Sequence, residues 1–222
     1  MGEVHSRFLT SEQKEIFSYF VPVPGMEKQI CKAMEEIILK PDNTSATGNI
    51  MIIGDRGSGK TQLATNIIRV IQKEVNKENA KVGKISAAVL NKKDIIELFS
   101  KMAGGYLIIE KIGDLNRETA TKLSLAMDQD TNRLIVIIED TSAGIKELNI
   151  QNPEFVKKFS SRIAIPIFTN DELVSFAETY ANEFGYEIDQ MAILALYNRI
   201  SNIQKIDRAT TLSEVKEIVD GA

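Results

Sequence analysis

The sequence predicts an α/β fold in which a parallel sheet is followed by a small all-helical segment. Five apolar runs alternate with amphipathic helical patterns, as in parallel sheets covered by helices on both faces. Apart from a weaker run near Val82–Ser86, the runs are continuously apolar, which is typical of strands buried on both faces. Strand patterns stop near Thr169, and only helical patterns follow. We therefore expect an N-terminal helical leader or linker over residues 1–40, an α/β core over 41–168 and a helical lid over 169–222.

Two helical patterns precede the sheet. They cover Ser11–Phe20 and Met26–Lys40, and Val21–Gly25 separates them because proline and glycine interrupt regular structure. A polar loop, Pro41–Gly48, leads into the first strand. Strands are expected at Ile50–Ile53, Val82–Ser86, Tyr106–Ile109, Leu134–Ile138 and Ile163–Ile167. Since Pro166 cannot donate to a ladder, its strand should lie at a sheet edge or end there.

Amphipathic helices are expected between the strands and after the last one. Those of the core are Lys60–Val75, Lys92–Met102 and Arg117–Asp128. Those of the lid are Asp171–Phe184, Asp189–Ile203 and Leu212–Val219. The change from mixed to all-helical patterns places the boundary at Phe168–Asn170.

The composition excludes several kinds of site. The 222 residues carry a formal net charge of -4 with a pI of about 5.3, and Glu78, Asp94 and Glu97 flank the lysines at 81, 84, 92 and 93, so a nucleic-acid partner is not expected. A single cysteine, Cys31, and a single histidine, His5, exclude an internal disulfide and a His/Cys metal site. There is no signal segment, and no apolar run approaches the roughly 20 residues of a membrane span. We expect a cytoplasmic protein without a membrane partner.

The segment Gly54–Thr61 reads GDRGSGKT and matches the phosphate-binding pattern G-x-x-x-x-G-K-[ST] in full, between a strand and a helix. Its glycines let successive backbone N–H groups point at phosphate oxygens. Lys60 would neutralise the β- and γ-phosphates, and the Thr61 hydroxyl would hold magnesium. The expected cofactors are ATP (or ADP) and Mg²⁺. The expected binding residues are Gly54, Asp55, Arg56, Gly57, Ser58, Gly59, Lys60, Thr61 and the adjacent Gln62.

Glu110 follows the strand Tyr106–Ile109 and is the candidate acid that would hold magnesium, or a water on it, together with Thr61. Lys111 stands where ATP hydrolases of this kind have the glutamate that activates water. An ammonium has no acceptor, and as a base at pH 7 it would need its pKa lowered by about three units from about 10.4. The alternative is that both residues merely end a core strand, with Lys111 in solvent.

These motifs together resemble the AAA+ ATPases, and within them the CbxX/CfxQ branch, the relatives of red-type Rubisco activase, with a degenerate Walker B motif. The resemblance spans roughly Val21–Val219. It is carried by PGM at 24–26, GDRGSGKT at 54–61, YLIIE at 106–110, RLIVIIED at 133–140, NPEF at 152–155, KKFSSRIAI at 157–165 and FTNDEL at 168–173.

The resemblance implies a P-loop AAA+ fold, with a five-stranded parallel sheet in the order 5-1-4-3-2, flanking helices and a helical lid. It implies that Gly25 and Met26 lie on the adenine side of the nucleotide. It also implies that Arg162, just before the last strand, reaches into the ATP of a neighbouring subunit in a ring or open homo-oligomer. The alternative for Arg162 is a surface arginine that ends a strand. The usual lid arginine is missing from its place, and Arg208 is the candidate substitute.

Two functions follow from these residues. The first is an ATPase with slow or conditional hydrolysis that remodels or assembles an unknown protein partner, with Glu139 or Asp140 positioning the lytic water in place of Lys111. The second is a non-hydrolysing scaffold gated by nucleotide. A small-molecule kinase and a DNA-linked role are disfavoured. The expected catalytic residues are Lys60, Glu110, Glu139, Asp140 and Arg162.

Overall fold

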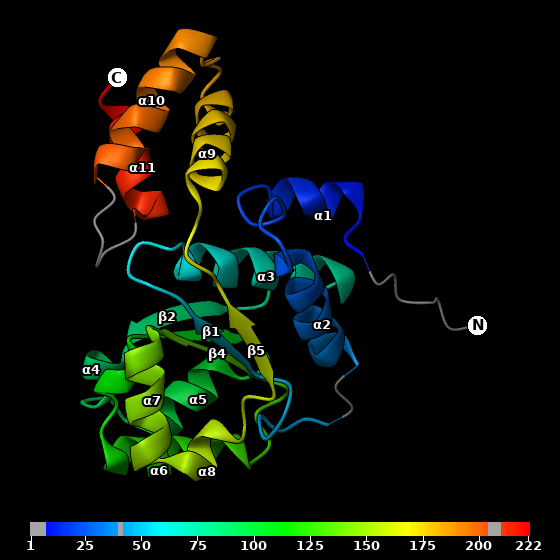
Figure 1. Cartoon of the computed structure of the whole chain (residues 1–222). Coiled ribbons are helices and arrows are strands. Elements are labelled where there is room, and N and C mark those ends of the chain that lie inside the picture. Colours follow the sequence, from blue (N-terminus) through cyan, green and yellow to red (C-terminus); the bar gives the residue numbers. More distant parts are fainter. Residues whose placement is uncertain (1–7, 40–41, 204–209) are drawn as a thin grey trace.

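The computed structural model describes residues 8–39, 42–203 and 210–222. A parallel five-stranded sheet lies at its centre, and the last three helices stand beyond α3, on the far side from α5, α6 and α8 (Figure 1). The strands are β1 (Ile50–Ile53), β2 (Val82–Ser86), β3 (Tyr106–Glu110), β4 (Ile135–Asp140) and β5 (Ser161–Ala164). Their order, β2-β3-β4-β1-β5, is the expected 5-1-4-3-2 read from the other edge, so the predicted fold is confirmed.

The predicted helices are present, and three helices were not predicted: α4, α7 and α8. Ser86 caps α4 and Thr141 caps α7, while Pro153 occupies the first turn of α8. Among the residues described, no helix is long and apolar enough to cross a membrane. The helices are α1 (Ser11–Ile16), α2 (Met26–Ile38), α3 (Lys60–Glu74), α4 (Ala87–Leu90), α5 (Ile95–Met102), α6 (Arg117–Met127), α7 (Ser142–Gln151), α8 (Pro153–Val156), α9 (Asn170–Glu183), α10 (Gln190–Ile203) and α11 (Leu212–Asp220), with a 3-10 turn η1 (Ile112–Asp114).

The ends of three strands differ from the prediction. β3 includes Glu110, β4 runs two residues farther, to Asp140, and β5 begins two residues earlier, at Ser161, and ends at Ala164. β5 lies at the sheet edge and ends before Pro166, which agrees with the missing N–H of proline. Arg162 therefore lies inside the last strand rather than before it, because the pairing with β1 already starts at Ser161.

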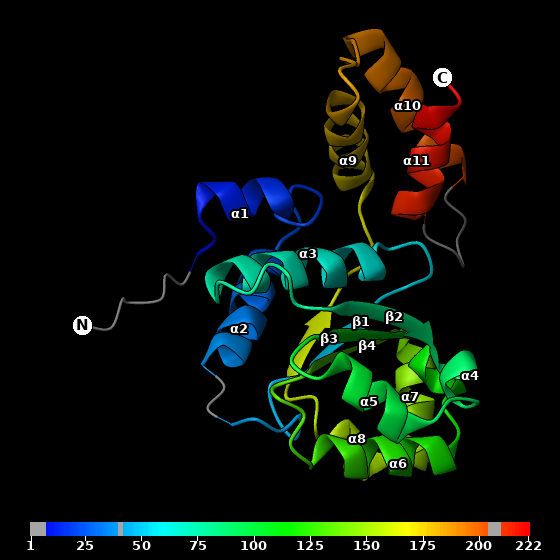
Figure 2. The same ribbon diagram turned by 180° about the vertical axis from the view of Figure 1, so that it is seen from behind.

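Each face of the sheet has its own hydrophobic core. Alternate strand residues such as Ile108 and Ile137 pack with α2 and α3, whereas Ile109 and Ile138 pack with α4–α8. In Figure 2 the helices α5, α6, α7 and α8 lie below the sheet and α3 lies above it. A residue's place in this alternation therefore decides which layer its side chain meets.

The outer edge of β5 is covered by α2. The Gln29 side chain accepts a hydrogen bond from Ala164 N (2.8 Å) and donates to Ala164 O (3.3 Å), as a neighbouring strand would. Two turns later, Glu36 accepts hydrogen bonds from the hydroxyls of Ser160 and Ser161. α2 thus binds the outer backbone groups of Ala164 and the hydroxyls at the start of β5, which hinders the pairing of a further strand with this edge.

The fully buried side chain of Asn49 fixes the start of β1. Its amide donates to Ser45 O (2.7 Å) and Lys158 O (3.0 Å), and its oxygen accepts from Val136 N (3.0 Å). Asn49→Leu keeps the volume but removes all three bonds, so we expect it to lower the free energy of unfolding by roughly 3 kcal/mol in chemical denaturation. Asn198→Leu, at an exposed position of α10, is the control and should change it by less than about 0.5 kcal/mol. Equal effects of the two substitutions would contradict this role.

Candidate phosphate-binding site

The loop Gly54–Gly59 joins β1 to α3 at the carboxyl edge of the sheet. Gly57 (φ 75°) and Gly59 (φ 87°) have left-handed conformations that favour glycine. A Cβ on Gly59 would lie 3.1 Å from the ring of Phe20, and Gly54 N donates to Asp140 O at 3.1 Å. The loop is therefore fastened to the end of β4, and it brings the chain to the N-terminus of α3, where unpaired backbone N–H groups can bind anions.

Lys60 begins α3 and folds back over the loop. Its Nζ donates to Gly54 O (3.0 Å) and Asp55 O (2.7 Å). Burial lowers the pKa of Lys60, and the charges of Glu139, Asp140 and Asp55 oppose this shift. The ammonium is thus held beside the loop that would carry the phosphates, among the groups that favour its charged form.

Two carboxylates converge on Thr61, the second residue of α3. Its hydroxyl lies 2.6 Å from Glu139 Oε1 and 3.2 Å from Glu110 Oε1. Glu110 is half-buried, 3.6 Å from the Lys84 ammonium, whereas Glu139 is 5% exposed. In the described part of the chain no three His, Cys, Asp or Glu residues form a group suited to a metal. The polar oxygens gathered at Thr61 are those of two carboxylates and one hydroxyl.

The alternation along β4 separates the two acids that the sequence grouped together. Glu139 follows Ile137 on the α3 face, whereas Asp140 follows Ile138 on the opposite face. The carboxylate of Asp140 accepts from Gly113 N (2.7 Å) and Thr141 N (2.7 Å), so it fastens η1 and the start of α7. The structure therefore brings Glu139, and not the Asp140 carboxylate, to Thr61.

Lys111 follows β3 and starts η1. It has a left-handed backbone (φ 52°) and an exposed side chain. This placement agrees with the solvent-facing alternative for Lys111 and gives no acceptor for a proton.

Burial raises the pKa of Glu139, while its bond with Thr61 lowers it and the neighbouring Glu110 raises it further. Ionisation of Glu139 therefore destabilises the folded protein. The free energy of unfolding should fall as the pH rises through the raised pKa of Glu139. In a chelator at neutral pH we expect Glu139→Gln to raise the melting temperature by roughly 2–4 °C, the shift that ~1 kcal/mol produces in a chain of this size. The gain should shrink in thermal scans at lower pH, and a gain that grows on acidification would contradict the assignment.

The lid touches the phosphate loop at the start of α11. Ser213 donates to Gly57 O from both its N (3.2 Å) and its hydroxyl (3.4 Å). A Cβ on Gly57 would lie 2.8 Å from Thr211 Oγ1, the cap of α11. A side chain at Gly57 would therefore force the Thr211 and Ser213 side chains to shift.

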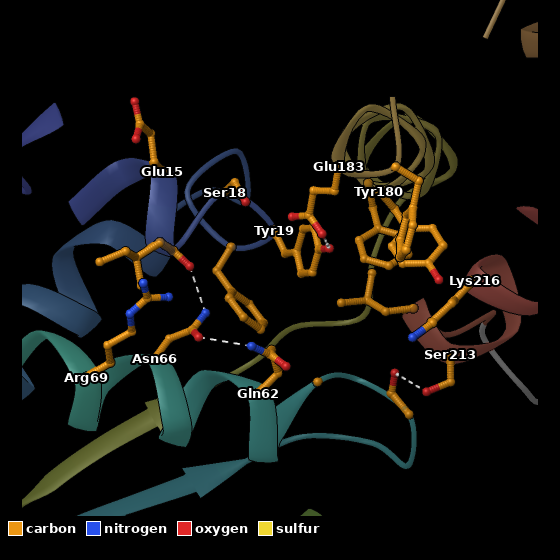
Figure 3. Close-up of a pocket in the computed structure, with 17 residues that line it drawn as sticks. Glu15, Ser18, Tyr19, Gln62, Asn66, Arg69, Tyr180, Glu183, Ser213 and Lys216 are labelled. Carbon is orange, nitrogen blue, oxygen red and sulfur yellow. Dashed lines mark hydrogen bonds between the residues drawn. The ribbon is translucent and has the colours of Figure 1, made fainter. Parts of the chain in front are cut away.

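A cavity of about 520 Å³ lies between the turn after α1, the start of α3 and the lid (Figure 3). Gln62 faces it and donates to Asn66, which in turn donates to Ile16 O. Tyr19 donates to Glu183 across the cavity, so the N-terminal segment and the lid are joined directly. The cavity is lined by aromatic side chains from both sides, namely Tyr19, Phe20, Phe176, Tyr180 and Phe184.

Sequence reasoning missed this aromatic lining. Its signal was the spacing of Phe176, Tyr180 and Phe184 by four positions along α9, which places them on one side of a helix. Gly25 and Met26, expected on the adenine side, do not line the cavity. Met26 is fully buried as the first residue of α2, because its side chain joins the core between α2 and the sheet.

Arg162 lies apart from these groups. It is exposed on the edge strand β5, and within the described part of the chain it forms no hydrogen bond or ion pair. Arg208 lies outside the described residues. Lys216, which was not singled out from the sequence, lines the cavity from α11 with its Nζ 5.0 Å from the centre of the Tyr180 ring.

The chain is similar in structure to proteins that share little of its sequence. Domain III of the Thermotoga maritima replication initiation protein DnaA matches with a TM-score of 0.64 and 16% identity, over 94% of this chain and 96% of that one. Two mutants of Thermotoga maritima RuvB match with TM-scores of 0.58 and 0.55 and identities of 17% and 15%, over 88% and 90% of this chain and 69% of theirs. No family model matches the sequence, and no curated protein matches it. With the strand order, these neighbours show that the chain has the AAA+ fold.

Proposed function

We propose that the protein binds ATP or ADP with Mg²⁺ and hydrolyses ATP slowly or conditionally, coupled to the assembly or remodelling of a protein partner. The observation that carries the proposal is the contact of the lid with the phosphate loop, Ser213 to Gly57, beside a cavity that the N-terminal segment also lines. A nucleotide whose phosphates lie on the loop would place its base toward this cavity and contact all three parts. The N-terminal segment (1–40), core (41–168) and lid (169–222) would then act as separate units joined by the ligand.

The roles of the loop residues follow from their positions. The backbone of residues 54–59, with the N-terminus of α3, would bind the phosphates, and Lys60 would exchange its loop carbonyls for phosphate oxygens. Thr61 and Glu110 would hold Mg²⁺. Hydroxyl and carboxylate oxygens are the ligands that this ion prefers, and the two already lie within hydrogen-bond distance.

Slow hydrolysis follows from the absence of an ordinary base. Lys111 has no acceptor, and both oxygens of Asp140 are held by backbone N–H groups. Of the two candidate acids, Glu139 and Asp140, only Glu139 has its carboxylate at Thr61. Any ATP turnover should therefore depend on Glu139. In this proposal, Glu110 and Lys111 form a degenerate Walker B motif. The segments NPEF and FTNDEL would place the chain in the CbxX/CfxQ branch.

The second candidate function is a scaffold that binds nucleotide without hydrolysing it. Its support is the direct bond between Tyr19 and Glu183, which couples the lid to the N-terminal segment at the edge of the cavity. A ligand that binds only the closed arrangement stabilises it by mass action, which is sufficient for a switch. Either function fits a homo-oligomer, ring or open, in which the exposed Arg162 meets a neighbouring subunit.

The test is Mg²⁺-dependent ATP turnover at rising protein concentration, with Lys60→Ala as the blank. Turnover that rises faster than linearly and vanishes in the blank supports an assembling ATPase. ATP binding that raises the melting temperature without turnover supports the scaffold. If ATP neither binds nor turns over, both are rejected.

A further inference from the structure

The two carboxylates at Thr61 are neighbours in the sheet. Glu110 on β3 pairs in register with Glu139 on β4, and both side chains point to the α3 face. Like charges directly opposite each other on one face of a sheet are destabilising. Both also lie within hydrogen-bond distance of the same hydroxyl, which has one proton to donate. Thr61 can therefore satisfy only one of the two acids at a time.

Nothing in the described part of the chain neutralises Glu139 by direct contact. Its Oε2 is buried and without a hydrogen-bond partner. Of the nearby cations, Lys60 donates to the carbonyls of the loop and Lys84 lies beside Glu110. An unpaired buried carboxylate is costly, so this cluster is complete only with a further positive group.

A shared proton fits the cluster poorly. One proton would neutralise only one of the two acids. A cation can contact oxygens of both acids and of Thr61 at once, and Glu139 Oε2 receives no hydrogen bond that a cation would have to displace. The convergence of the three side chains therefore favours a metal ion over a proton.

We propose that Glu139, Glu110 and Thr61 form a divalent-cation site that binds Mg²⁺ or Mn²⁺ in the absence of nucleotide. This deepens the proposed function, on which it rests for the location of the site, by adding a carboxylate from β4 as a metal ligand. The cation would be resident before ATP arrives, and waters would fill its other positions until phosphate oxygens replace them.

The experiment is a titration of the chelator-treated, nucleotide-free full chain with Mn²⁺, followed by the signal of free Mn²⁺ in electron paramagnetic resonance. We expect one Mn²⁺ per chain, and at least about tenfold weaker binding for Glu139→Gln and for Glu110→Gln. Glu154→Gln, which removes an exposed carboxylate paired with Lys157, is the matched control and should bind as the wild type does. Lys60→Ala should bind Mn²⁺ at least as tightly as the wild type, because a neighbouring positive charge is gone.

Two results would overturn the proposal. One is a wild-type chain that binds Mn²⁺ only after ATP is added, and the other is unchanged Mn²⁺ binding in a folded Glu139→Gln variant, as expected if Glu139 served only a lytic water. ATP binding, measured separately with a fluorescent analogue in the presence of Mg²⁺, keeps the two proposals distinct. Mn²⁺ binding without ATP binding would reject the proposed function alone. ATP binding by a chain that binds no Mn²⁺ in the absence of nucleotide would reject the cation site alone.

Discussion

Lys60→Ala is expected to weaken ATP binding by at least about tenfold and to abolish turnover. The ammonium lies over the loop, where a phosphate would replace the Gly54 and Asp55 carbonyls as its acceptor. A hydrogen bond between charged groups contributes about 1.5–3 kcal/mol, and each 1.4 kcal/mol corresponds to a factor of ten in affinity. The loss should be seen by isothermal titration calorimetry with ATP and Mg²⁺.

The matched control for Lys60 is Lys122→Ala. Lys122 is an exposed lysine of α6 that pairs with Glu118 one turn away, and such surface pairs contribute little. Its variant should bind ATP as the wild type does. Because Lys60 bonds only to its own loop, its variant should remain folded, which the melting temperature checks. ATP binding that survives Lys60→Ala in a folded protein would mean that the motif does not bind the phosphates.

Arg162→Ala is expected to lower ATP turnover by about 10³-fold or more while leaving ATP affinity nearly unchanged. Arg162 is exposed on the edge strand and does not line the cavity of its own chain, so in the proposed function it would contact the ATP of a neighbouring subunit. A transition-state arginine supplied in trans contributes about 10³–10⁵ in rate. Arg117→Ala, which removes an exposed arginine at the start of α6, is the control.

A mixing experiment tests whether Arg162 acts across an interface. Lys60→Ala lacks the phosphate contact but keeps the arginine, and Arg162→Ala has the opposite defect. An equimolar mixture should recover about a quarter of wild-type turnover, because half of the subunits keep Lys60 and half of their neighbours keep Arg162. No recovery in mixed oligomers, or full activity of Arg162→Ala, would contradict the role of Arg162 and leave it as a surface residue.

Much of the fold could be predicted because its signals are local. The apolar runs gave the strands, and Pro166 placed the last one at an edge. The caps that start α4 and α7, Ser86 and Thr141, were also visible but were not used. α4 has only four residues, and Ile145 and Leu148 are the buried residues of α7, so hydrophobic periodicity gave little sign of either helix.

The candidate site was predictable where it is contiguous in the chain. The candidate phosphate loop could be found from the sequence, because its glycines adopt local backbone conformations and Lys60 bonds to carbonyls five and six residues before it. The acidic partners of Thr61 lie 49 and 78 residues away and follow from the packing of the strands. Glu139 and Asp140 are adjacent in sequence, yet the alternation of a strand sends one to Thr61 and the other to η1. The register of β3 with β4 then sets Glu110 beside Glu139, and such pairing depends on strands far apart in the chain, which no local pattern records.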